Sequence, residues 1–153
     1  MDRKLLSRLM MGLSLIFFIL SLFFETFGTG WPGYGALMLG WVEVIGVVDV
    51  GPFVAFAWFA NPLLLAVWLC VWLEKRMAAR LCATCGLGLG LLLLLGHEVL
   101  YSEGGNTSVL EYHCGYWLWL VSLLFGFIGA FLILTVSQKL EEKKKKYVGY
   151  LPV

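Results

Sequence analysis

Residues 74–80 read EKRMAAR, and this short cationic stretch decides how the chain can be folded. It separates two runs without charged residues, 50–73 and 81–96, and two more such runs cover 9–24 and 112–138. A helix needs about 20 residues to cross roughly 30 Å of hydrocarbon. The four runs therefore predict four membrane-spanning helices, at about 6–26, 53–73, 80–100 and 115–137, once the shorter runs are extended by flanking residues.

The composition agrees with a chain that is surrounded largely by lipid. Of 153 residues, 61% are hydrophobic and only 14% are charged, which is more apolar surface than a soluble domain of this size can bury. We expect an all-α membrane protein with a single transmembrane domain over 1–138 and a basic tail over 139–153.

The lysines and arginines predict the orientation. All 11 fall in three clusters: Arg3, Lys4 and Arg8; Lys75, Arg76 and Arg80; and Lys139 with Lys143–Lys146. Four spans place all three clusters on one face, which the positive-inside rule makes cytoplasmic. The sequence thus predicts a multi-pass membrane protein with both termini in the cytoplasm, and the lysines of 143–146 are expected to attract anionic lipid.

An apolar segment between the first two spans, GYGALMLGWVEVIGVV at 33–48, is not interpreted as a fifth span. At 1.5 Å per residue it would cover about 24 Å, and a fifth crossing would move the 74–80 stretch to the outer face. We expect an interfacial or re-entrant helix at about 34–48 on the outer side. Gly33, Gly35 and Gly40 would let this helix approach the bundle closely.

The second span carries Asn61 and Pro62 side by side in AFAWFANPLLLAVWLC, residues 55–70. Pro62 has no N–H and leaves the carbonyl of Trp58 without its helical donor, so we expect a bend and a replacement partner for that carbonyl. The amide of Asn61 must also face protein rather than lipid. Two interpretations remain open: Asn61 bonds across helices, or the bend opens an outward-facing polar cavity.

Other polar and aromatic residues are expected near the outer face. Glu43, His97 and Glu98 are candidates for an outer vestibule, and Trp41, Trp58, Trp117 and Trp119 for interfacial aromatic residues. His97 and Glu98 are adjacent and would point about 100° apart on a helix, so they do not form a ready chelate. We predict no metal site and no cofactor.

Three segments carry a resemblance: Leu-Gly-Trp at 39–41, AWFANPLL at 57–64 and GYWLWL at 115–120. In these segments the chain resembles a group of small uncharacterised bacterial inner-membrane proteins with four helices, although Trp117 departs from the shared pattern. The resemblance implies a location in the bacterial inner membrane. It implies no activity and no catalytic residue.

The cysteines offer one possible chemistry. Cys82 and Cys85 have the C-x-x-C spacing of thiol redox proteins, but they follow Arg80 and would lie near the reducing cytoplasmic face. The sequence holds no catalytic motif and no nucleic-acid-binding fold. We expect a protein without enzymatic activity.

The function predicted first is binding to another membrane protein within the bilayer, as an accessory subunit or as an immunity protein against a membrane-active toxin; a homo-oligomer is also possible. The alternative is a channel or transporter for ions or small molecules with an outward-facing polar vestibule. The third hypothesis is a redox or metal protein that uses the thiols.

Overall fold

The structure, a computed structural model, describes residues 3–27, 32–44, 56–95, 98–100, 107–109 and 111–132. Its α-helices are α1 (Arg3–Phe23), α2 (Gly33–Val44), α4 (Ala60–Trp72), α5 (Arg76–Leu92) and α6 (Cys114–Leu132). A short 3-10 helix, Leu93–Leu95, continues α5, and the strands β1 (Glu98–Leu100) and β2 (Thr107–Val109) pair in antiparallel fashion. The described part is therefore predominantly helical.

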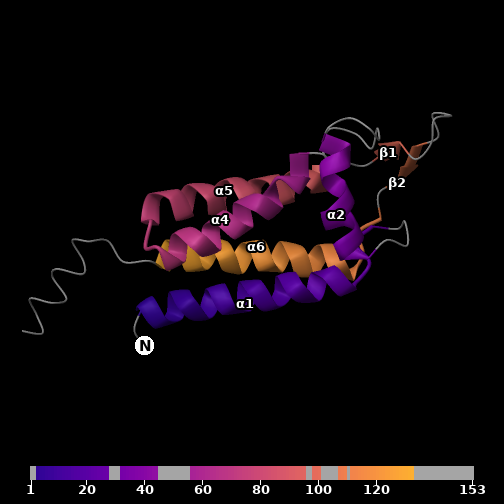
Figure 1. Cartoon of the computed structure of the whole chain (residues 1–153). Coiled ribbons are helices and arrows are strands. Elements are labelled where there is room, and N and C mark those ends of the chain that lie inside the picture. Colours follow the sequence, from indigo (N-terminus) through magenta and orange to yellow (C-terminus); the bar gives the residue numbers. More distant parts are fainter. Residues whose placement is uncertain are drawn as a thin grey trace, which may run out of the picture.

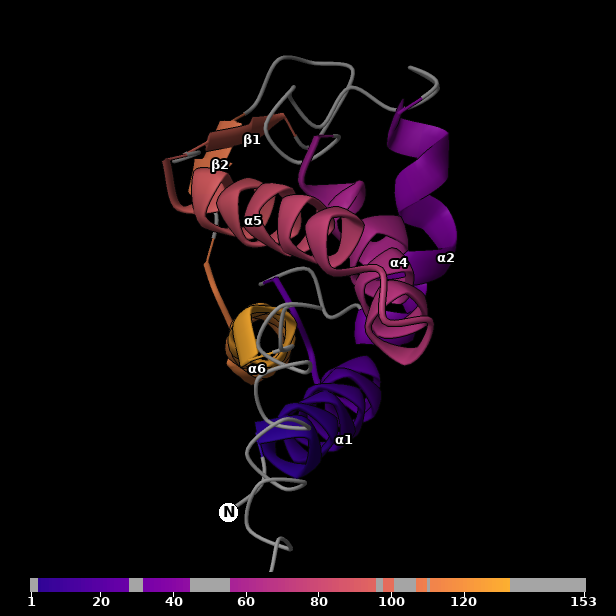
Figure 2. The same cartoon turned by 90° about the vertical axis from the view of Figure 1, so that its left-hand side faces the viewer.

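Four helices form a bundle and one lies across its end. Figure 1 shows α1, α4, α5 and α6 side by side, with α2 running across them at the end opposite the N-terminus. Seen along the bundle in Figure 2, α1 lies beside α6, and α4 lies beside α5. The helix α5 also packs on α6 and closes the bundle.

Helix length and composition agree with the predicted spans at three of four places. Within the described residues, three helices are long and apolar enough to cross a membrane: Lys4–Phe23, Arg76–Leu95 and Cys114–Leu132. The helix at the predicted second span, Phe56–Trp72, is apolar but shorter. The third helix also ends before its predicted limit, because residues 98–100 form β1.

The interface between α1 and α6 is built from small residues at seven-residue spacing. Ser7, Ser14 and Ser21 are all buried on α1, and Gly115, Ser122 and Gly129 are buried on α6. The hydroxyl of Ser7 donates to the carbonyl of Gly129 at 2.8 Å, and that of Ser14 donates to the carbonyl of Ser122, also at 2.8 Å. Small residues and serine hydroxyls let two helices approach closely and hold one register in an apolar solvent.

The turn between α4 and α5 explains where α4 stops. Glu74 adopts a left-handed backbone conformation with φ of 57°. The N–H of Lys75 donates to the carbonyl of Cys70 at 2.7 Å, and that of Glu74 donates to Val71 at 3.1 Å. These two bonds form a Schellman motif, which satisfies carbonyls at the end of α4 that have no helical donor.

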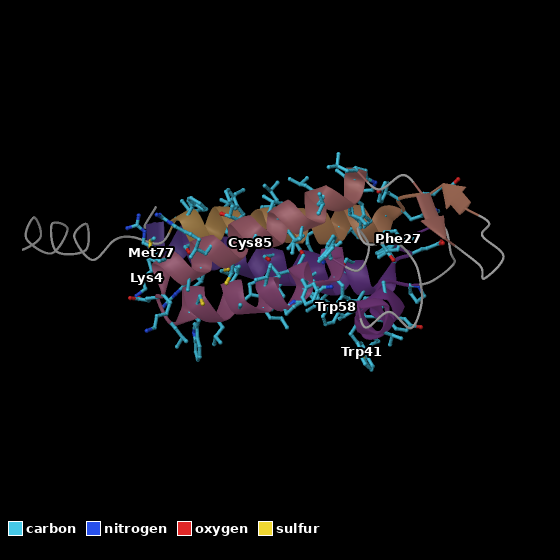
Figure 3. The ribbon with its side chains drawn as sticks, turned by 90° about the horizontal axis from the view of Figure 1, so that it is seen from above. Lys4, Phe27, Trp41, Trp58, Met77 and Cys85 are labelled. Carbon is cyan, nitrogen blue, oxygen red and sulfur yellow. The ribbon has the colours of Figure 1, made fainter. Side chains whose placement is uncertain are left out.

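This turn lies at the same end of the bundle as the start of α1 and the end of α6. The Lys4 ammonium is 2.9 Å from the Glu74 carboxylate, and an Arg80 guanidinium nitrogen donates to the carbonyl of Phe131 at 3.0 Å. Figure 3 shows Lys4 and Met77 together at this end, with Trp41 and Trp58 at the other. We refer to these as the cationic end (Lys4, Arg8, Lys75, Arg76, Arg80) and the α2 end.

The crosswise helix α2 contacts the bundle through its glycines. Gly33, Gly35 and Gly40 are buried, as predicted. A Cβ atom added at Gly33 would overlap the carbonyl oxygen of Ser21 on α1. Another face of α2 exposes Tyr34, Met38 and Trp41, which are large and mostly apolar side chains. Residues 45–48 of the predicted interfacial segment lie outside the described residues.

Candidate functional site

The polar pair in the second span forms a hydrogen-bonded link between α4 and α6. The Asn61 amide nitrogen donates to the carbonyl of Trp58 at 3.1 Å. Its oxygen accepts a hydrogen bond from the indole nitrogen of Trp119 on α6 at 2.8 Å. Asn61 thus replaces the donor that Pro62 cannot supply and bonds across helices, as the first of the two interpretations predicts.

Pro62 is accommodated because α4 begins just before it. One turn residue, Phe59, separates the helical residues 56–58 from α4, so Pro62 occupies the first turn of α4, where proline is tolerated. The backbone of Phe59 keeps right-handed helical angles, φ −62° and ψ −16°. At the place of the predicted bend, the structure therefore shows a single turn residue in a helical conformation.

Trp58, next to this turn residue, bonds to the crosswise helix. The Trp58 indole nitrogen donates to the carbonyl of Leu37 on α2 at 3.0 Å. A Cβ atom at Gly40 would overlap the Trp58 ring. Because Gly40 has no side chain, the Trp58 ring packs directly against the α2 backbone. The hydrogen bond from the indole then holds α2 against the bundle.

A second set of bonds continues the network toward the middle of the bundle. The Ser122 hydroxyl donates to the carbonyl of Trp119 at 2.7 Å. The hydroxyl of Ser14 bonds to the Ser122 carbonyl and also accepts a hydrogen bond from the indole nitrogen of Trp68 at 3.0 Å. Helices α1, α4 and α6 are thus joined by polar groups that satisfy one another inside the bundle.

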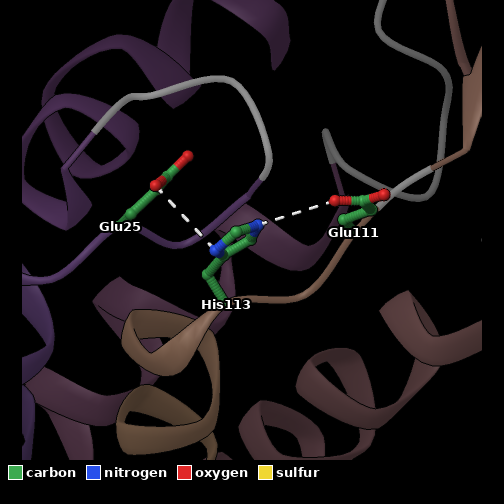
Figure 4. A network of polar contacts seen from close by, with 3 residues as sticks. All are labelled: Glu25, Glu111 and His113. Atoms are coloured by element: carbon green, nitrogen blue, oxygen red, sulfur yellow. Dashed lines mark ion pairs between the residues drawn. The ribbon is translucent and has the colours of Figure 1, made fainter.

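A cluster of titratable side chains lies at the α2 end, where the chain leaves α1 and enters α6. Figure 4 shows the His113 imidazole between two carboxylates, 3.8 Å from Glu25 and 3.9 Å from Glu111. The backbone fixes this arrangement, because the N–H of His113 donates to the carbonyl of Thr26 at 3.1 Å and that of Gly115 donates to Glu25 at 2.8 Å. The side chains of Glu25 and His113 are both more than a third exposed, and the acids lie near the positive end of the α6 dipole.

Tyrosines beneath this cluster close the end of α5. The Tyr112 hydroxyl donates to the carbonyl of Leu93 at 2.6 Å, and that of Tyr116 donates to the carbonyl of Gly90 at 3.0 Å. Both carbonyls lie at the end of α5, where helical donors run out. Burial raises the pKa of the Tyr112 phenol above its ordinary value, because the charged phenolate would lose its hydration.

The predicted aromatic residues divide into two kinds. Trp41 and Trp117 are exposed, as an interfacial position requires, and Trp117 lies in the first turn of α6. Trp58 and Trp119 instead use their indole nitrogens for the internal bonds described above. Their contribution is helix association rather than contact with the membrane surface.

The side chains of the predicted vestibule lie outside the part of the chain that the structure describes. The backbone of Glu43 belongs to α2 and that of Glu98 to β1, while their side chains are not described. His97 and the lysines of 143–146 lie outside the described residues.

The four cysteines are free thiols, and within the described ranges no group of histidine, cysteine or acidic residues could hold a metal ion. Cys85 and Cys114 are exposed, whereas Cys70 and Cys82 are half-buried.

Sequence reasoning did not identify the serines of α1. It did expect the acids and histidines at the span ends, Glu25, Glu111 and His113 among them, to converge at the outer face. The spacing of Ser7, Ser14 and Ser21 is a detectable signal, since it repeats every seven residues on one helical face. The pairing of 24–27 with 112–115 decides which of these acids and histidines meet, and it brings Glu25 and His113 together.

Comparison of the chain with family models, with curated proteins and with solved structures finds no match in any of the three.

Proposed function

We propose that the chain is a four-span protein of the bacterial inner membrane, with the cationic end in the cytoplasm and α2 at the outer interface. The helix Phe56–Trp72 lies in the bundle beside helices long enough to span, which supports its role as the fourth span. The described lysines and arginines flank the helices at one end only. The described acids other than Glu74 lie at the other end, in keeping with this orientation.

The outward surface supports the same environment. Large apolar side chains are exposed along the bundle helices, among them Leu5, Ile16, Leu65, Leu69, Leu81, Leu91, Leu124 and Phe131. In water such a surface would be a strong aggregation hazard, whereas in lipid it costs nothing.

Single-cysteine labelling tests the orientation. In a cysteine-free background, we expect the Glu111→Cys variant to react with a membrane-impermeant maleimide in intact cells. The Lys75→Cys variant, at an exposed position of the opposite end, should react only after permeabilisation. Labelling of position 75 in intact cells would invert the proposed topology.

We further propose that the protein has no enzymatic activity and acts by binding another membrane protein, as an accessory subunit or as an immunity protein. The observation that carries this proposal is the internal use of the polar groups. The side chains of Asn61 and Ser14 form hydrogen bonds between helices, and Ser122 accepts one of these bonds through its main-chain carbonyl. What the molecule offers outward is its apolar flank and the exposed face of α2, formed by Tyr34, Met38 and Trp41.

Site-specific photo-crosslinking tests this proposal. A photoreactive residue at Met38 should give one dominant protein adduct in the host membrane, which must be recovered reciprocally when the partner is tagged. The matched control is Leu69, which is 55% exposed on α4 and should give lipid adducts. The same adducts at both positions would argue against recognition through α2.

A measurement of ion flux distinguishes the channel or transporter hypothesis from the binding proposal. If the purified protein conducts ions in liposomes, and Asn61→Leu abolishes flux while circular dichroism shows an intact helical fold, the transport hypothesis replaces the binding proposal. We expect no flux above that of empty liposomes.

A further inference from the structure

The cationic end holds more positive charge than its described carboxylate can balance. Among the described residues, five cations lie there, and Glu74, 2.9 Å from Lys4, is the acidic residue beside them. Two of the cations, Arg76 and Arg80, are one helical turn apart at the start of α5. Like charges at this spacing repel each other unless an anion lies between them or nearby.

Arg80 is held in place by the end of α6. One of its terminal nitrogens donates to the carbonyl of Phe131 at 3.0 Å, and its guanidinium lies over the Phe131 ring, 4.9 Å from the centroid. Its Nε atom is buried and has no acceptor among the described residues. The side chain is therefore fixed in position while one of its donors stays unsatisfied.

Arg76 repeats the pattern without the anchor. Its Nε atom is also buried without an acceptor, and no hydrogen bond or ion pair joins its guanidinium to another described residue. A buried polar donor without a partner is costly, and more so when it carries charge. Two such donors on adjacent turns of one helix are placed to bind an anionic acceptor.

We propose that Arg76 and Arg80 form a binding site for the phosphate group of an anionic phospholipid in the leaflet at the cationic end. A phosphate presents several oxygen acceptors, and the planar guanidinium is the group best suited to bind them in pairs. The first turn of α5 adds the positive end of its dipole. Basic pockets between membrane helices bind lipid headgroups in this way.

This site differs from the predicted attraction of lipid by the tail lysines at 143–146, because it uses two helix-bound arginines. The proposal rests on the bundle lying in a bilayer, but it does not depend on which side of the membrane the cationic end faces.

The test measures thermal unfolding of the full chain in a neutral detergent with added lipid. Dioleoyl phosphatidylglycerol should raise the unfolding temperature, whereas dioleoyl phosphatidylcholine should leave it nearly unchanged. Arg76→Gln should weaken the apparent affinity for phosphatidylglycerol by about tenfold, since one guanidinium–phosphate interaction is lost. The matched control is Lys75→Gln, which removes the same charge from the neighbouring exposed position and should change the affinity less than twofold.

A second variant guards against misfolding of the first. Arg80→Lys keeps the charge but removes the fork of donors, so it should also weaken lipid binding while the helical signal stays intact. If Arg76→Gln and Lys75→Gln weaken binding equally, general electrostatic attraction explains the effect and the site is overturned.

Two further results would overturn the lipid assignment. Inorganic phosphate that stabilises as strongly as phosphatidylglycerol, at equal concentration, would make the ligand a soluble anion. A Glu141→Gln/Glu142→Gln variant that binds phosphatidylglycerol tenfold more tightly than the original chain would show that the tail carboxylates fill the site. All of these measurements use the purified protein in detergent, without a partner protein. A negative result here therefore leaves the partner proposal, which is tested in the host membrane, unaffected.

Discussion

The side-chain amide of Asn61 donates a hydrogen bond to the main-chain oxygen of Trp58, the carbonyl that proline at the next position leaves without a donor. One residue therefore repairs the backbone of its own helix, and its second polar atom remains available for α6. This dual use explains why a polar amide stands beside a proline in a segment otherwise made of apolar residues.

Removing the Asn61 side chain should destabilise the bundle. Asn61→Ala leaves the Trp58 carbonyl and the Trp119 indole without partners, and we expect a loss of about 1–3 kcal/mol in the free energy of unfolding. A double-mutant cycle with Trp119→Phe should give a coupling energy of about 0.5–2 kcal/mol. Unfolding in mixed micelles measures both, and Trp117→Phe, which changes an exposed indole, should show no coupling with Asn61.

If the backbone N–H that Pro62 lacks is restored, the hydrogen bond from the Asn61 amide to the Trp58 carbonyl should become redundant. Pro62→Ala supplies an N–H that can reach the Trp58 carbonyl, so the cost of Asn61→Ala should be smaller in the Pro62→Ala background than in the original chain. The same unfolding measurement compares the two costs. Equal costs in both backgrounds would mean that the Trp58 carbonyl is not what the amide stabilises.

The contact between Gly33 of α2 and the backbone of α1 should not tolerate an added Cβ atom. At Gly33 the atom would overlap the Ser21 carbonyl, which is rigid backbone, and we expect Gly33→Ala to cost about 1–3 kcal/mol. The matched control is Gly88→Ala on α5, where nothing lies within 4 Å. That variant should be neutral or stabilising by up to about 1 kcal/mol, since alanine favours helix over glycine. Thermal unfolding of the two variants side by side gives the comparison.

The left-handed residue in the α4–α5 turn offers a stabilising substitution. Glu74→Gly removes the steric penalty of a side chain at φ of 57°, worth about 1 kcal/mol, but also removes the ion pair with Lys4. That pair is partly exposed and should be worth less than about 1 kcal/mol. We therefore expect a larger gain from Glu74→Gly when Lys4 is already glutamine. If the free energy of unfolding rises equally in both backgrounds, the Lys4–Glu74 ion pair does not contribute to stability.

Alkaline pH should weaken the α5–α6 contact through Tyr112. Burial raises the pKa of this phenol in the folded state, so its contribution to stability is complete below the pKa of the unfolded chain, about 10. It is lost as the pH rises from there through the folded-state pKa. Unfolding temperatures measured between about pH 8 and pH 11 should fall less steeply for Tyr112→Phe than for the original chain. Tyr34→Phe, on the exposed face of α2, is the control that removes a phenol but leaves the bond to Leu93.

Much of the arrangement follows from local patterns. The clustering of cations predicted that the starts of α1 and α5 and the end of α6 lie together, and the described contacts of Lys4 and Arg80 bring those ends to one side. Gly33, Gly35 and Gly40 were expected to let α2 approach the bundle closely, and all three are buried. The limits of the third helix were less accurate, since residues 98–100 are apolar enough to extend a span yet pair as a strand with 107–109.

The chain's apolar runs correctly predicted helices, three of them long and apolar enough to cross a membrane, and a shorter helix between the first two. The bond of Asn61 across helices was one of two interpretations that the sequence left open. The apolar runs could not reveal which surfaces meet. Between lipid and protein there is little hydrophobic preference, so small residues such as the serines of α1 can mark a face that packs but do not tell which helix packs on it. The pairing of α1 with α6 and the seat of Trp58 on α2 depend on close backbone approach and on hydrogen bonds between residues far apart in the chain. Such contacts exist only once the helices are assembled.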